Sequence, residues 1–179
     1  VSVYFDGSTI GAMTDDNGKF TLQNDKGYNN SICNFAEKEE CEKMEYVKIP
    51  YVEKGVSRIF YGTAGQPFMM GGDANDLLDA IYATGVNAFD TARNYMLAEK
   101  SLGKWIVERG MRDKIVILSK CGHPSPFGRK RVNEKDIRKD LRKSLGYLGT
   151  DYIDIYLLHR DDPEVPVGEI VEIFNSLHS

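Results

Sequence analysis

Residues 115–159, IVILSKCGHPSPFGRKRVNEKDIRKDLRKSLGYLGTDYIDIYLLH, contain two short apolar runs separated by one long amphipathic stretch. The runs predict strands at Ile115–Leu118 and Tyr152–Leu158, because a nearly continuous apolar run is typical of a strand covered on both faces. Between them, Asn133 is expected to cap a helix, and an apolar stripe follows at helical spacing: Ile137, Leu141, Leu145 and Leu148. This strand–helix–strand order predicts βα units on a parallel sheet.

The same alternation extends in both directions from this stretch. Toward the N-terminus, strands are predicted at Val56–Tyr61 and Val86–Asp90. The helix after the first begins at about Asp73 and ends before Gly85, and the helix after the second ends before Gly110. Toward the C-terminus, Pro166 is expected at the first position of a fourth helix, which carries Val167, Ile170, Val171, Phe174 and Leu177.

Four βα units make up half of a TIM-type (β/α)8 barrel, the α/β fold class that we predict. A complete barrel needs about 250 residues, so these units alone would leave an open apolar edge. A doubly wound open sheet is the alternative. Its usual phosphate-binding fingerprint, G-x-G-x-x-G after the first strand, is missing, because residues 62–72 read GTAGQPFMMGG.

The region before the βα units differs in character, and we assign residues 1–42 to a β-hairpin-like extension or linker. The turn-forming run at 15–18, DDNG, lies between the strand-like segments 10–14 and 20–22. Residues 43–179 are then the half barrel, with a second small hairpin within residues 46–54 expected to plug its bottom. The chain starts without Met and stops inside an apparently helical run, so both ends are expected to be cut.

Composition excludes several classes of function. A net charge of −4 argues against a nucleic acid partner, and no apolar run reaches the ~20 residues that cross a bilayer. The start of the chain lacks the pattern of a signal peptide, so a cytoplasmic location without membrane attachment is expected. The cysteines Cys33, Cys41 and Cys121 form no metal-binding pattern, and we expect reduced thiols and no metal site.

Three titratable residues lie at the C-terminal ends of successive strands. Asp90 ends the second strand, Lys120 follows the third and His159 follows the fourth. Catalytic groups of such barrels gather at this rim, and Tyr95 can fold back over it from the next loop. Each residue alone has an ordinary structural explanation. Together they indicate a site, because charges buried at one rim are costly unless they pair with one another.

The motifs around these residues resemble a known family. Residues 89–103, FDTARNYMLAEKSLG, are similar to the signature of aldo-keto reductases, F-D-T-A-x-x-Y-G-x-S-E-x-x-L-G. The resemblance covers about residues 46–179 and continues through ILSK and YIDIYLLHRDDP. Met96 and Ala98 replace the usual Gly and Ser after the tyrosine, a difference that bears on loop or substrate shape.

The resemblance implies a barrel that binds NAD(P)H at its C-terminal mouth, with NADP expected and NAD as the alternative. It makes Tyr95 the general acid, Lys120 its partner, Asp90 the counter-ion of the lysine and His159 the residue that orients a substrate carbonyl. Gly62 and Thr63 would form, with Asp90, the platform beneath the nicotinamide. A phenol donates its proton more readily beside a cation, which agrees with these roles.

The function expected from this reading is reduction of an aldehyde or ketone to an alcohol by an NADP-dependent oxidoreductase. The small-molecule carbonyl compound is the expected partner, and the isolated 179-residue piece is expected to have little activity. A regulatory or sensor module that binds the nicotinamide cofactor with little turnover is the alternative. A further hypothesis is self-association through the open edge of the barrel.

Overall fold

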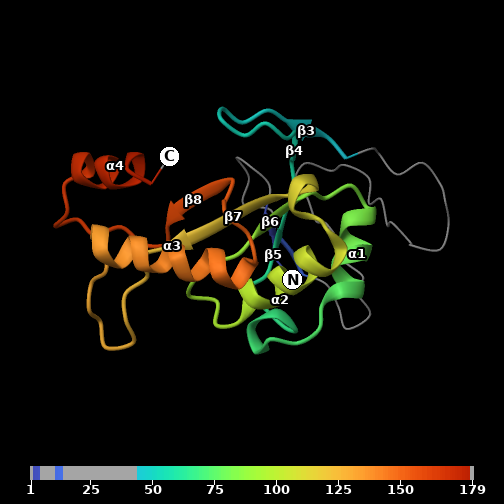
Figure 1. Cartoon of the computed structure of the whole chain (residues 1–179), viewed down its shortest axis with the longest axis horizontal. Coiled ribbons are helices and arrows are strands. Elements are labelled where there is room, and N and C mark those ends of the chain that lie inside the picture. Colours follow the sequence, from blue (N-terminus) through green and yellow to red (C-terminus); the bar gives the residue numbers. More distant parts are fainter. Residues whose placement is uncertain (1, 5–10, 14–43, 178–179) are drawn as a thin grey trace.

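A parallel sheet forms the centre of the part of the chain that the computed structural model describes, which is residues 2–4, 11–13 and 44–177. Its strands lie in the order β5-β6-β7-β8, with each strand beside its predecessor in the sequence (Figure 1). Their bounds are Phe60–Gly62, Ala88–Asp90, Val116–Cys121 and Ile155–Leu158. This order is the one expected for consecutive βα units of a barrel.

Helices alternate with these strands as the sequence pattern predicts. The α-helices are α1 Asn75–Ala83, α2 Ala98–Arg109, α3 Glu134–Leu148 and α4 Val167–Asn175. Two short 3₁₀ helices, η1 Phe68–Met70 and η2 Arg112–Lys114, lie in the connections. In Figure 1, α2 and α3 run side by side along the sheet.

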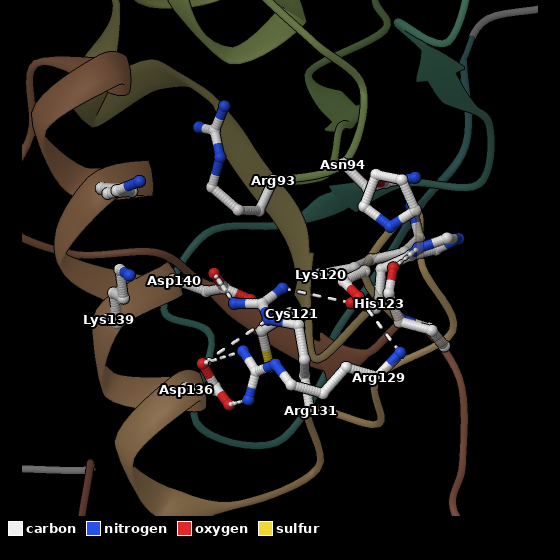
Figure 2. A pocket seen from close by; sticks show the side chains of 14 residues that line it. Arg93, Asn94, Lys120, Cys121, His123, Arg129, Arg131, Asp136, Lys139 and Asp140 are labelled. Atoms are coloured by element: carbon white, nitrogen blue, oxygen red, sulfur yellow. Dashed lines mark hydrogen bonds and ion pairs between the residues drawn. The ribbon is translucent and has the colours of Figure 1, made fainter.

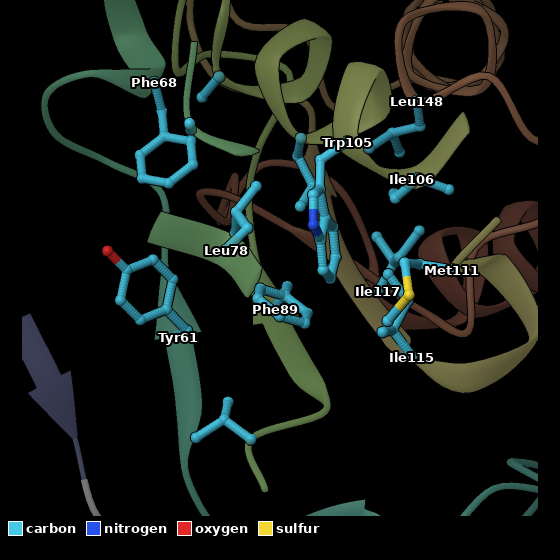
Figure 3. Packing of buried hydrophobic residues seen from close by; sticks show 14 residues of the cluster. Tyr61, Phe68, Leu78, Phe89, Trp105, Ile106, Met111, Ile115, Ile117 and Leu148 are labelled. Atoms are coloured by element: carbon cyan, nitrogen blue, oxygen red, sulfur yellow. The ribbon is translucent and has the colours of Figure 1, made fainter. Parts of the chain in front are cut away.

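The core lies between the sheet and these helices. Alternate strand residues point to it, so that Tyr61, Phe89 and Ile117 pack against the helices (Figure 3). Trp105 of α2 is fully buried, with its ring centroid 5.3 Å from that of Phe89. Asp90 directly follows Phe89, and Lys120 is three residues after Ile117, so both point to the opposite face of the sheet from these core residues.

A hairpin closes the N-terminal end of that second face. Its strands are β3, Tyr46–Val47, and β4, Val56–Ser57, which pair antiparallel. Ile49 and Val52 in the connection pack against a cluster that includes Ala88 and Val116. The predicted hairpin within residues 46–54 is thus wrong in its pairing, since the partner strand comes from residues 56–57, but the segment does cover the bottom of the sheet.

Two predicted strands also differ from the observed ones. Residues 56–61 form β4 and β5 rather than one strand, because the backbone leaves the antiparallel pair before it joins the parallel sheet. β8 starts at Ile155 instead of Tyr152. Asp154 accounts for the delay, since its carboxylate accepts from the backbone N–H of Ile117 at 2.9 Å and pairs with Arg112 at 2.7 Å.

The helix ends are close to those predicted. The side chain of Asn133 caps α3 by accepting from the backbone N–H of Asp136 at 3.0 Å. α1 begins at Asn75, two residues after Asp73, whose carboxylate accepts from the Asn75 N–H. Pro166 is the N-cap residue of α4 and not its first helical residue, since its ψ of 135° is extended.

Near the N-terminus, two short strands are described. β1, Ser2–Tyr4, pairs antiparallel with β2, Gly11–Met13, and β1 lies next to β5. The hairpin predicted between residues 10–14 and 20–22 has its second strand outside the described residues, as do Cys33 and Cys41. The division into an extension at 1–42 and a half barrel from 43 stays a prediction.

Gly103 allows α2 and α3 to approach each other closely. A Cβ atom at this position would lie 2.1 Å from the carbonyl oxygen of Tyr147 and 2.7 Å from the Cα atom of Leu148. No side chain fits at such distances, so the final glycine of the 89–103 motif is needed for backbone packing. It positions the two helices that follow β6 and β7.

Candidate active site

An ion pair between neighbouring strands forms the base of the site. Asp90 is the last residue of β6 and Lys120 the fifth of β7, and both point to the same side of the sheet. The Lys120 ammonium pairs with the Asp90 carboxylate and also donates to the carbonyl oxygen of Thr91 at 3.0 Å. Lys120 lies within its strand rather than after it, because β7 extends to Cys121.

Tyr95 comes over this pair from the loop between β6 and α2. Its hydroxyl oxygen lies 3.5 Å from the Lys120 Nζ atom, which is also 5.1 Å from the centre of the phenol ring. The loop is tight, since the N–H of Tyr95 donates to the carbonyl oxygen of Ala92 and its own carbonyl accepts from Ala98. The sequence pattern that placed Tyr95 near the rim is therefore matched by the geometry.

His159 follows β8 directly and continues its ladder, with its N–H donating to the carbonyl oxygen of Cys121 at 2.7 Å. Its ring meets that of Tyr95 edge to face, 5.4 Å between centroids. Burial lowers the pKa of His159 to about 4, and the nearby charges of His123, Lys120 and Arg160 act in the same direction. The imidazole is consequently neutral at physiological pH.

The proton of a neutral His159 has a preferred position. Among the described residues, Nδ1 is buried and has no hydrogen-bond partner. A proton there would be an unsatisfied buried donor, which is costly. The tautomer with its proton on Nε2 avoids that cost and presents an N–H for a ligand. Asp90, Tyr95, Lys120 and His159 thus lie together, and they can hold a polarised oxygen and move a proton to it.

At the end of β5, beside Asp90, the sheet surface carries no side chain. Gly62 is the register partner of Asp90, so the position next to the carboxylate on the same face carries no side chain. Thr63 is fully buried, and both its N–H and its hydroxyl donate to the Asp90 carbonyl oxygen, at 2.9 Å and 3.1 Å. Thr63 therefore ties the backbone after Gly62 to the backbone of Asp90.

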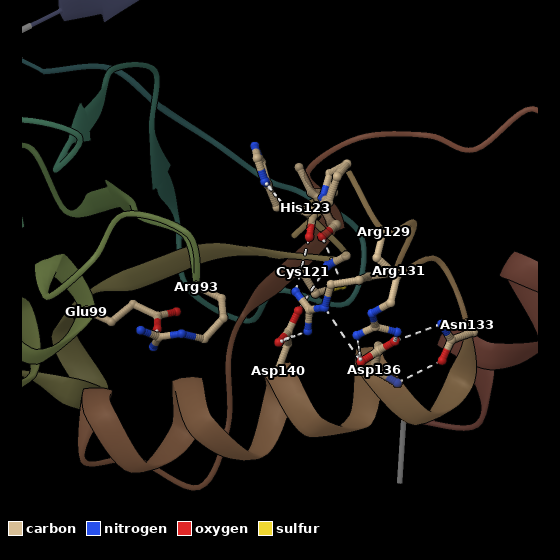
Figure 4. Close-up of polar contacts among 12 residues, drawn as sticks. Arg93, Glu99, Cys121, His123, Arg129, Arg131, Asn133, Asp136 and Asp140 are labelled. Carbon is tan, nitrogen blue, oxygen red and sulfur yellow. Dashed lines mark hydrogen bonds and ion pairs between the residues drawn. The ribbon is translucent and has the colours of Figure 1, made fainter. Parts of the chain in front are cut away.

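The sequence reasoning missed a buried polar network behind the site. Arg93 forms an ion pair with Glu99, which is fully buried and also accepts from the Ser119 hydroxyl at 2.7 Å (Figure 4). Burial raises the pKa of Glu99, while Ser144, Arg93 and Ser119 favour its ionised form. The Arg93 guanidinium also donates to the carbonyl oxygen of Met96 and so holds the loop of Tyr95.

A signal for this network was present in the sequence. Glu99 falls on the apolar side of α2 together with Ala98 and Leu102, where a carboxylate needs a buried partner. The motif contains two cations, Arg93 and Lys100, and the structure shows that Arg93 is the partner of Glu99. A second missed residue is His123, whose ring packs edge to face on that of His159 at 4.8 Å and whose Nδ1 atom contacts the Pro124 carbonyl oxygen.

The described residues do not meet the requirements of a reactive cysteine, a metal site or a membrane-spanning helix. Cys121 is a free, buried thiol that donates weakly to the Leu157 carbonyl oxygen, and burial raises its pKa to about 12. That thiol is unreactive as a nucleophile. Within the described ranges, no group of His, Cys, Asp and Glu is placed to hold a metal ion, and no helix is long and apolar enough to cross a membrane.

Two known proteins are similar to this chain in sequence. Protein tas of Escherichia coli is 34% identical over 133 residues, which cover 65% of this chain and 38% of that protein. Aldo-keto reductase YhdN of Bacillus subtilis is 33% identical, with 75% of this chain and 44% of YhdN covered. The chain thus spans less than half the length of these relatives.

A solved structure supports the same relationship. Aldo-keto reductase AKR11C1 from Bacillus halodurans, in its holo form, superposes with a TM-score of 0.63 at 28% identity, covering 75% of this chain and 46% of that protein. The likeness indicates a TIM-barrel fold, of which the described residues show a parallel sheet with its helices. Residues 58–179 match the Aldo/keto reductase family. The chain therefore belongs to the aldo/keto reductase family.

Proposed function

We propose that this chain carries the proton-transfer half of an NAD(P)H-dependent carbonyl reductase, which converts an aldehyde or ketone to an alcohol. The observation that carries the proposal is the position of the Lys120 ammonium, paired with Asp90 and 3.5 Å from the Tyr95 hydroxyl oxygen. A phenol so placed is poised to give up a proton, because the phenolate left behind is stabilised by the adjacent positive charge.

The proton moves from the Tyr95 hydroxyl to the carbonyl oxygen of the substrate. Lys120 stabilises the resulting phenolate, and Asp90 keeps the ammonium charged and aimed at it. The carbonyl oxygen of Thr91 holds the same ammonium from a second side at 3.0 Å. Lys120 is therefore fixed in place before substrate arrives, which reduces the reorganisation that the reaction requires.

His159 supplies the second contact to the substrate oxygen. With its proton on Nε2, the neutral imidazole donates one hydrogen bond to the oxygen on which negative charge develops. Its ring packs edge to face against that of Tyr95, so the two side chains are neighbours in the site.

The residues at the end of β5 fit a nicotinamide ring. Gly62 leaves the face beside Asp90 free of side chains, and Thr63 anchors the backbone there, so a flat ring has room against the sheet. Gly62, Thr63 and Asp90 are accordingly the residues that we assign to cofactor contact. A bound reduced nicotinamide supplies the hydride to the carbonyl carbon. NADPH is the cofactor that we propose, with NADH as the alternative.

The part of the sheet that is described does not enclose the site on every side. Leu157, on the same face as Lys120, is 43% exposed, whereas strands that close a barrel bury such positions. We therefore propose that these four βα units act as half of a barrel and that the 179-residue chain alone turns over carbonyl compounds poorly.

The test uses the full-length protein that contains this chain and a panel of small aldehydes and ketones with NADPH. Tyr95→Phe should lower kcat by about 100-fold or more, because it removes only the proton donor. Tyr82→Phe is the matched control, since Tyr82 lies near the end of α1 and packs edge to face on Trp105, and it should leave kcat unchanged.

Near-normal turnover by Tyr95→Phe would rule out the proton-donor role. Tight binding of NADPH with no turnover of any carbonyl compound by the unmodified full-length protein would instead favour a sensor that reads the redox state of the cofactor. Turnover and NADPH binding of the unmodified protein together separate the enzyme from the sensor.

A further inference from the structure

A cavity of about 330 Å³ opens beside the active-site rim, between the loop of Arg93 and Asn94, the loop from His123 to Arg131, and α3 (Figure 2). In Figure 2, Lys139 borders it from the helix, while His123 and Arg129 border it from the opposite loop. Lys120 is the one residue of the proposed proton transfer that also lines this cavity, whereas Asp90, Tyr95 and His159 do not line it. Its lining is unusually basic.

Most of the charge in the lining is already paired. Asp136 is held by Arg129 at 2.8 Å and 3.1 Å, and Asp140 is held by Arg131 at 2.6 Å. Of the remaining cations, Arg93 pairs with Glu99 and Lys120 pairs with Asp90. Each carboxylate in the lining therefore has its own arginine, and none remains to neutralise a further cation.

Two cations in the lining remain uncompensated. Lys139 and Lys143 lie one turn apart on α3, and both are exposed to solvent. Within the described ranges, neither ammonium forms a hydrogen bond or an ion pair with a protein group. Like charges four residues apart on a helix repel each other, so this pair is unfavourable until an anion lies between or beside them.

We propose that this cavity binds the phosphate group of a small molecule. A phosphate monoester carries close to two negative charges at neutral pH, which match the two uncompensated ammonium groups. Neutral donors are also present, because Asn94 and Ser125 line the same cavity. The cavity volume is at the lower end of ligand pockets and matches a phosphate with a short carbon chain.

The first experiment measures binding without catalysis. Inorganic phosphate is titrated into the protein by calorimetry at pH 7.5 and low salt. Saturable binding is expected, and Lys139→Ala/Lys143→Ala should weaken it by about 10-fold or more, since each lysine contributes a charge-assisted contact. Lys100→Ala/Arg142→Ala removes the same charge from exposed positions outside the cavity and should change the affinity by less than about 2-fold.

Two results would overturn the proposal. One is the absence of saturable phosphate binding by the unmodified protein, and the other is an equal loss of affinity in both double variants. Thermal melting of each variant shows whether it is folded. Amide shifts on addition of phosphate give an independent readout, and they should concentrate at residues 93–94 and 123–129 and not on α4.

A second experiment identifies the molecule that carries the phosphate. In the full-length protein, kcat/KM is compared for a short aldehyde and for the same aldehyde bearing a phosphate. The ratio of interest is kcat/KM for the phosphorylated aldehyde divided by kcat/KM for the unphosphorylated one. If the phosphate belongs to the substrate, Lys139→Ala/Lys143→Ala lowers this ratio. If it belongs to a separate effector, the ratio is unchanged while phosphate affinity falls. Because binding is measured without turnover, failure of the proposed reductase activity does not affect the first test.

Discussion

The guanidinium of Arg93 donates a hydrogen bond to the main-chain carbonyl oxygen of Met96, 3.0 Å away, and so bridges the two sides of the loop that carries Tyr95. Between these residues the chain turns sharply, and Met96 has a positive φ of 49°. Relatives in the aldo/keto reductase family have glycine here, by the motif quoted above. The sequence difference therefore coincides with a backbone conformation that disfavours any side chain.

Replacing Met96 with glycine should stabilise the protein. A left-handed backbone costs a non-glycine residue about 1 kcal/mol or more, and part of this gain is offset by the greater freedom of glycine in the unfolded chain. We expect Met96→Gly to raise the free energy of unfolding by about 0.5 kcal/mol in urea titrations. Leu97→Gly, at a negative φ, should lower it, and a loss of stability in Met96→Gly would contradict the argument.

The contact at Gly103 predicts a large difference between two glycine substitutions in neighbouring helices. Gly103→Ala should lower the free energy of unfolding by about 2 kcal/mol or more, because the new methyl group would overlap the backbone of α3. Gly146→Ala, where nothing lies within 4 Å, should raise it by about 0.5–1 kcal/mol through helix propensity. Equal effects in chemical denaturation would show that the helices do not pack this closely.

The active-site ion pair predicts unequal losses for its two members. Lys120→Met removes the cation that stabilises the phenolate, and kcat of the full-length protein should fall by about 100-fold or more with a smaller change in KM. Asp90→Asn should cost about 10-fold, since the Thr91 carbonyl still holds the ammonium. Lys100→Met, an exposed residue of α2, serves as the control. A larger loss in Asp90→Asn than in Lys120→Met would reverse the assigned order of importance.

Burial of His159 predicts the direction of one pH effect. Its pKa is about 4 in the folded protein against a usual value of 6.5, so the folded state binds fewer protons than the unfolded chain between these values. The free energy of unfolding should therefore rise as pH increases from about 4 to 6.5. His159→Gln should flatten this slope in denaturation curves measured at several pH values.

The control for His159 uses the ring beside it. His123→Gln removes a neighbouring charge that contributes to the low pKa of His159, but burial is the larger cause. Most of the slope should thus remain in His123→Gln. An unchanged slope in His159→Gln would mean that another group titrates in this range.

Much of the site could be predicted from the sequence because strand residues alternate between faces. Residues 88–90 and 116–120 lie in neighbouring strands. The register between them places Asp90 beside Leu118 and brings Lys120 to the same rim. The cap at Asn133 and the left-handed glycine Gly110 at the end of α2 could also be predicted, because they follow local rules.

The remaining differences arise from contacts between distant residues. The start of β8 depends on Asp154, whose carboxylate pairs with Arg112 and the Ile117 N–H, and neither partner is near it in sequence. The pairing of residues 46–47 with 56–57 depends on how the connection covers Ala88. Such tertiary contacts override local patterns, and a single sequence does not contain the distances that decide them.

In the site itself, the position of Tyr95 could be predicted from its place in the loop after Asp90 and in a family motif, whereas the contacts that support this loop could not. Glu99 lies in the first turn of α2, where an acidic residue ordinarily interacts with the helix dipole. Only the structure shows that this carboxylate is fully buried and bound by Arg93.

The close approach of α2 and α3 also concerns the reach of the two candidate sites. α2 begins where the Tyr95 loop ends, and α3 carries Lys139 and Lys143. The backbones of α2 and α3 are in contact at Gly103. The distance from the Tyr95 phenol to the ammonium groups of Lys139 and Lys143 is therefore determined by how these two helices pack. Only a molecule of matching length could touch both at once, so selectivity for substrate size would originate in a glycine that no ligand contacts.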